Sequence, residues 1–144
     1  MTELERTTID FLILADRVEA VNGKLYMMGG AWDQLNVANF QAPVMMSLAL
    51  AVMVPWNETN ETHEMELYIE TEDGVPLEPR IHGKLNTGRP PTAVKGQSFR
   101  SIVAVNGIWV FPGPGTYRVV ASLGNGETKK VCLYASSTGV PTIA

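Results

Sequence analysis

The chain has 144 residues, one cysteine and a net charge of −4, with its 11 basic residues scattered rather than clustered. This length matches one ordinary domain, which can bury a stable core without disulfides or bound metals. The single Cys132 cannot form a disulfide within the chain. The sequence shows no cluster of basic residues that could bind a phosphate backbone, so we expect no nucleic-acid partner.

Two apolar runs, Ile9–Leu14 and Val44–Val54, fall short of the ~18 residues that a membrane-spanning helix needs. The first also follows acidic residues, where a secretory signal peptide would be basic. We therefore expect a cytoplasmic protein without a membrane partner, formed by a single domain over residues 1–144.

The first clear turn is Asn22-Gly23, a pair typical of two-residue hairpin loops. A hairpin about it places Val18, Ala20, Leu25 and Met27 on one side, because side chains alternate across a strand. The opposite side is polar.

The next strand, Val44–Val54, is large and apolar at its even positions, which we assign to the core. Its other face is small or flexible and consists of Met45, Ser47, Ala49, Ala51 and Met53. A face open to water is normally polar, so something should cover it. Either another part of the chain does so, such as residues 35–40 or the later proline loop, or a second copy does. The second alternative makes self-association through this sheet face our leading hypothesis, with these five residues as the interface.

Trp56, between Pro55 and a polar loop, is a candidate exposed aromatic. With Trp109 and Tyr68 it could form a stacking platform, which makes a small-ligand or carbohydrate-binding module the alternative function. A buried tryptophan that fills a corner is the more ordinary interpretation of Trp56.

The run His63–Glu72 predicts a strand with one packed and one wet face, because Met65, Leu67 and Ile69 alternate with polar residues. Asp73-Gly74 marks its end.

A third and less favoured function is a hydrolase-like enzyme centred on His82, which would need Ser98 or Ser101 across the sheet. The two histidines and the cysteine have no metal-ligand spacing, and no nucleophile–base pattern is present. We therefore expect no catalysis, no metal and no cofactor.

After a proline-rich surface connection at residues 88–96, strands are predicted at Phe99–Val105 and Ile108–Phe111, with a turn at Asn106-Gly107 between them. A last hairpin closes through the three-residue loop 124–126. Its register aligns Tyr117, Val119 and Ala121 with Val131, Leu133 and Ala135. Cys132 would then be partly exposed, although a buried, inert thiol is equally compatible with the residue type.

About eight or nine short strands with turns at near-regular intervals, and no helical period, predict an antiparallel β-sandwich of immunoglobulin-like character. We expect it to act as a non-catalytic binding or assembly module, with itself or another protein as partner.

The run from Asn22 to Leu35, Asp73-Gly74, Asn106-Gly107 and the Pro114–Tyr117 segment resemble a family of small uncharacterised bacterial β-sandwich proteins. The resemblance covers most of the chain and consists of turn and core residues. It implies a β-sandwich fold and a bacterial origin, and it carries over no catalytic residue. The run Ile108–Phe111 is bulkier than the family pattern.

Overall fold

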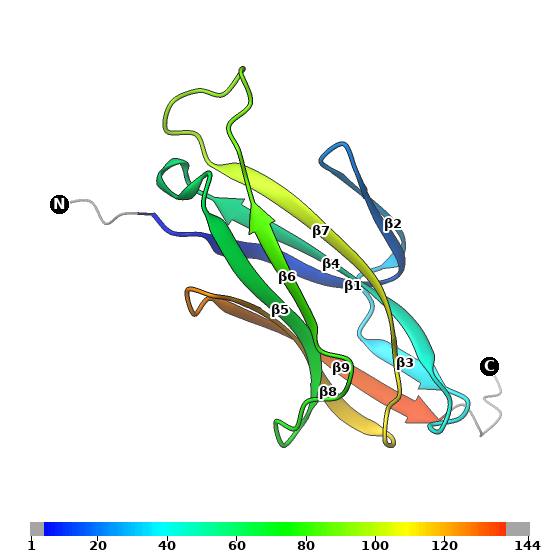
Figure 1. The fold of residues 1–144 in the computed structure, drawn as a ribbon. Coiled ribbons are helices and arrows are strands. Elements are labelled where there is room, and N and C mark those ends of the chain that lie inside the picture. Colours follow the sequence, from blue (N-terminus) through cyan, green and yellow to red (C-terminus); the bar gives the residue numbers. More distant parts are fainter. Residues whose placement is uncertain (1–4, 138–144) are drawn as a thin grey trace.

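The computed structural model describes residues 5–137, which form two packed β-sheets (Figure 1). The strands are β1 (Thr8–Val21), β2 (Lys24–Gly30), β3 (Gln34–Val37), β4 (Val44–Val54), β5 (Thr62–Thr71), β6 (Ile81–Asn86), β7 (Phe99–Trp109), β8 (Gly115–Leu123) and β9 (Thr128–Ser137). The one helical segment in these residues is the short 3-10 turn η1 (Trp56–Glu58). None of the described helical structure is long enough to cross a membrane.

The first sheet has the strand order β2-β1-β4-β7 and the second has the order β3-β9-β8-β5-β6. Nine strands in two sheets confirm the predicted all-β, sandwich-like architecture. The expectation of a purely antiparallel arrangement is wrong at one edge, where β3 pairs parallel with β9. The cause is that β3 follows a crossing from the first sheet to the second rather than a hairpin turn.

The core lies between the two sheets and is built from the alternate positions of their strands. Leu48 and Leu50 of β4 are at most 1% exposed, as are Leu67 and Ile69 of β5. Burying each such side chain contributes about 1.5–3 kcal/mol, which is how a chain without disulfides is held together. The period-two pattern of β5 is thus confirmed, except that Glu70 on the expected wet face is 6% exposed.

Two predicted turns are confirmed together with their registers. Around Asn22-Gly23, Val18 lies opposite Met27 and Ala20 opposite Leu25. In the last hairpin Tyr117 lies opposite Leu133, and the Leu123 amide donates to the Glu127 carbonyl across the three-residue loop.

The predicted turn at Asn106-Gly107 is wrong, because β7 runs unbroken from Phe99 to Trp109 along β4. The two residues have other uses there. A Cβ on Gly107 would lie 2.3 Å from the Trp109 ring, so glycine makes room for that buried indole. The Asn106 side chain instead bonds the backbone of Val18 in β1.

Candidate functional site

The small face of β4 is covered by the chain itself. Ser47, Ala49 and Ala51 are at most 2% exposed. Ala49 packs in a second small cluster with Ala15 and Val18, against Phe11 and Leu25.

The cover therefore comes from β1 and the β1–β2 hairpin, not from residues 35–40 or the proline loop. This hairpin reaches over the first sheet and is tied to it at Asn106 of β7, whose side-chain amide bonds both backbone polar groups of Val18. These three residues of the predicted interface are consequently out of reach of a second copy. Of the other two, Met45 is 62% exposed and Met53 is half-buried.

The three candidate ligand-binding aromatics do not form a common platform. Trp109 is fully buried, and its Nε1 donates to the Pro79 carbonyl at 3.2 Å, so the prediction that it serves as a surface aromatic is wrong. Tyr68 is half-buried, with the Arg80 guanidinium 4.9 Å from its ring centre.

Trp56 is half-buried, and one face of its indole is occupied by its own chain. The Arg89 guanidinium lies 3.9 Å from the centre of the ring, and its Nη2 donates to the Trp56 carbonyl at 2.7 Å. The Phe99 ring lies 6.3 Å away. Arg89 belongs to the proline-rich connection, so this cation–π contact fastens that loop to the sandwich.

His82 lies on the edge strand β6 with 68% of its side chain exposed. Its described polar partner is Glu66, 3.4 Å away, whereas the Ser101 hydroxyl contacts Thr87 at 2.9 Å. No described hydrogen bond joins His82 to Ser101 or to Ser98, so the serine–imidazole pair that the hydrolase hypothesis requires is not seen within residues 5–137.

Cys132 is exposed on β9, as the register predicted, so the buried thiol of the alternative interpretation is not observed. Tyr134 is two residues further along and points to the same side of the sheet. Charge repulsion by Cys132, with a side-chain hydrogen bond between the two, raises the pKa of the Tyr134 phenol above its ordinary value of 10.0.

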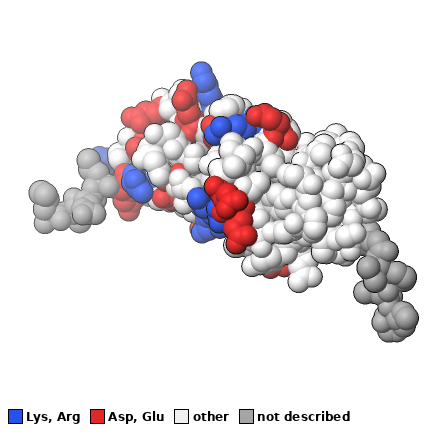
Figure 2. All heavy atoms as spheres, turned by 90° about the horizontal axis from the view of Figure 1, so that it is seen from below, with Lys and Arg blue, Asp and Glu red and all other residues white. Residues whose placement is uncertain are grey.

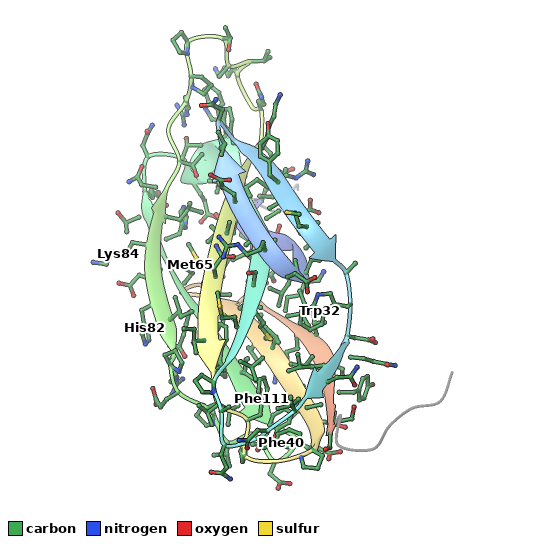
Figure 3. All side chains as sticks on the ribbon, turned by 90° about the vertical axis from the view of Figure 1, so that its right-hand side faces the viewer. Trp32, Phe40, Met65, His82, Lys84 and Phe111 are labelled. Atoms are coloured by element: carbon green, nitrogen blue, oxygen red, sulfur yellow. The ribbon has the colours of Figure 1, made fainter. Side chains whose placement is uncertain are left out.

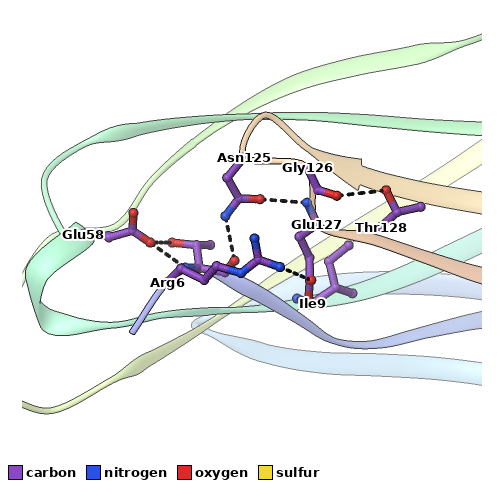
Figure 4. A network of polar contacts seen from close by, with 8 residues as sticks. Arg6, Ile9, Glu58, Asn125, Gly126, Glu127 and Thr128 are labelled. Atoms are coloured by element: carbon purple, nitrogen blue, oxygen red, sulfur yellow. Dashed lines mark hydrogen bonds and ion pairs between the residues drawn. The ribbon is translucent and has the colours of Figure 1, made fainter. Parts of the chain in front are cut away.

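A polar network closes the end of the sandwich where β1 begins (Figure 4). The Thr7 amide and hydroxyl both donate to Glu58, the Asn125 side chain donates to the Thr7 carbonyl, and the Ile9 amide donates to Glu127. Thr7 itself is fully buried. These contacts satisfy polar groups of two loops and of the start of β1, so the network has a structural role in closing this end.

Charge is unevenly distributed along the molecule. Figure 2 shows acidic and basic side chains gathered in one half of the visible face, whereas the half toward β3 is uncharged. The stretch from Ser101 to Tyr117 contains no charged residue. Strand β7 belongs to this stretch, apart from its first two residues.

An opening into the main core lies between β6 of one sheet and β7 of the other. It is a cleft of about 380 Å³ with Met65 and Leu67 on its floor. Its walls are formed by the apolar side chains Ile81, Leu85, Val103 and Val105. In Figure 3, Met65 lies between these two strands, whereas His82 and Lys84 project from β6 away from the gap.

The wall residues pack against the main core but are themselves only half-buried. On the opposite long side the sandwich is closed, because β1 lies against β9 and the Lys129 ammonium reaches the Asp10 carbonyl. Sequence reasoning missed the cleft. The sequence does hold one sign of this apolar wall, because residues 101–109 contain no charge and no proline. Only the strand order shows that this strand lies at the edge of its sheet.

The sequence matches a family described as a family of unknown function, DUF6941, over residues 10–136. The chain belongs to this family. The resemblance to an uncharacterised domain family is thereby confirmed. No curated protein matches the sequence.

Among solved structures, one similar chain is that of the "Putative ApaA Protein from Bordetella pertussis", known from a crystal structure. It is 14% identical, the match covers 90% of this chain and 92% of that chain, and the TM-score is 0.25. A likeness of this size supports no argument about function.

Proposed function

We propose that this DUF6941 protein is a non-catalytic binding module that recognises another protein chain at the cleft between β6 and β7. The observation that supports this proposal is the incomplete cover of the main core on that side, where Ile81, Leu85, Val103 and Val105 stay half-buried. Contiguous apolar surface of this kind marks interaction sites on small proteins. The exposed, unpaired Cys132 is compatible with a reducing, cytoplasmic location.

The strand order supports placing the fold among immunoglobulin-like sandwiches. In such a fold β1, β4 and β7 take the places of strands A, B and E, while β9, β8 and β5 take those of G, F and C. Tyr117 near the start of β8 donates its hydroxyl to the Gly113 carbonyl at 2.6 Å, which resembles the tyrosine corner of strand F. On this assignment no strand within residues 5–137 takes the place of strand D, which normally pairs with E, and that place is the edge of β7.

Sheet edges bind extended peptides, so the test uses a displayed library of random peptides of roughly ten residues, selected on the purified protein. The binding site of each selected peptide is then mapped by the NMR shifts of the protein's backbone amides. We expect the selected peptides to be apolar at alternate positions and to shift amides of β6 and β7. A Val103→Asp variant should lose this binding, whereas Met28→Asp, on the exposed β1–β2 hairpin, should keep it. Selected peptides that shift only amides of other elements would overturn the proposal.

A further inference from the structure

In the described part of the chain the two sheets have four edge strands, and three of them carry features that hinder the addition of another strand. Strand β3 has only 4 residues, and β6 has 6 residues with the exposed Lys84 among them. Strand β2 begins with Lys24 and contains Gly29 at φ 59°, which interrupts a regular edge. Short length, lysine and irregular backbone are the usual protections of an edge.

Strand β7 is neither short nor irregular, and its one charged residue, Arg100 near its start, is paired with Asp10 of its own chain. It has 11 residues in one continuous register with β4, and no charge or proline occurs from Ser101 to Trp109. Such an edge is a template for pairing, because every second residue directs its backbone N–H and C=O away from the sheet.

The accessible part of this edge is Phe99–Val105. At Asn106 the side chain bonds Val18 of β1, so the β1–β2 hairpin crosses the sheet there. Before that point, no described hydrogen bond other than those to β4 uses a backbone group of β7. Ile102 is the central residue of the seven.

We infer that the chain occupying this edge is a second copy of the protein, whose β7 pairs antiparallel with the first about a two-fold axis at Ile102. This inference rests on the proposed docking site and names its occupant. The two-fold axis stands perpendicular to the sheet, so inward-facing residues of the two copies lie on the same side. The Val103 and Val105 side chains of each copy then extend the apolar lining of the other's cleft.

The self-pairing is compatible with the charges of the strand. Arg100 is its single charged residue, and centring on Ile102 places it opposite an uncharged alanine, the second copy's counterpart of Ala104. Arg100 is also neutralised within its own chain, where its guanidinium lies 2.8 Å from Asp10. No like charges meet, and seven paired residues supply about six to eight backbone hydrogen bonds.

The test is a cross-link at the axis. Residues opposite each other in an antiparallel pair have Cα atoms about 4.5–5.5 Å apart, within the range of a disulfide. In a Cys132→Ser background, which removes the exposed native thiol, we expect the Ile102→Cys variant to form a disulfide-linked dimer under mild oxidation. The matched control is Met28→Cys in the same background, on the edge strand β2 with 72% of the residue exposed. It should stay monomeric.

A second readout uses mass and does not depend on the cross-link. Light scattering of the native protein should show a particle of twice the 15.7 kDa chain, and Ile102→Lys, which sets two ammonium groups opposite each other, should weaken the dimer at least tenfold. A native mass of 15.7 kDa at the highest soluble concentration, or equal cross-linking of the two cysteine variants, overturns the inference. Peptide mapping to β6 and β7 would still support the docking site in that case, so the two failures can be told apart.

Discussion

Replacing Asn106 by alanine should destabilise the protein by detaching the β1–β2 hairpin from β7. The Asn106 Nδ2 donates to the Val18 carbonyl at 3.0 Å, and its Oδ1 accepts from the Val18 amide at 3.2 Å and from the Ser47 hydroxyl. Val18 and Ser47 are 4% and 2% exposed, so their polar groups lose bonds that water cannot easily replace.

The size of the effect follows from these three bonds. Each contributes about 0.5–1.5 kcal/mol net, which gives roughly 1.5–4.5 kcal/mol together. Because the Asn106 side chain itself is exposed, water can reach part of the site, and we expect a loss of about 2 kcal/mol in the free energy of unfolding. Asn106→Asp should also destabilise, since it replaces the donor to the Val18 carbonyl by an oxygen.

The assay is equilibrium unfolding in urea, with hydrogen exchange at the Val18 amide as a local readout. Asn86→Ala is the matched control, because Asn86 is an exposed asparagine on the edge strand β6, and it should change stability by about 0.5 kcal/mol or less. Equal stabilities of the two variants, with unchanged exchange at Val18, would refute the bridging role of Asn106.

Two further outcomes are expected. Gly107→Ala should lower the free energy of unfolding by about 1–3 kcal/mol, because its Cβ would lie 2.3 Å from the buried Trp109 ring. The control Gly83→Ala should be nearly neutral, since the nearest atom to its Cβ would be 3.5 Å away. Equal effects of the two variants in urea unfolding would contradict this packing. Cys132→Ser should lower the pKa of Tyr134 toward 10.0, because it removes the charge repulsion by Cys132. An NMR titration of the phenol ring that shows no change would exclude that cause.

Much of the local structure was predictable because it depends on residues close together in the chain. The Asn22-Gly23 turn, the loop at residues 124–126 and the alternation of β5 all express preferences that act within one hairpin. The Val44–Val54 strand was predicted with its observed bounds, because apolar residues run through it unbroken.

The candidate site was predictable only in part. The sequence shows that one face of β4 needs a cover, but not that β1 and the β1–β2 hairpin provide it. The cleft between β6 and β7 could not be predicted, because its walls come from two sheets and its opening depends on which strands lie at their edges.

By itself, then, the sequence determined the strands β4 and β5, the two hairpin registers and the absence of charge from residues 101–109. The tertiary structure decided the role of Asn106-Gly107, which has the composition of a turn and lies within a strand. The local turn preference of these two residues stabilises less than their tertiary contacts do. Those contacts are three hydrogen bonds of Asn106 to residues far away in the chain and the Trp109 indole packed over Gly107. Contacts between distant residues are set only when the sheets assemble, and these contacts place the cleft.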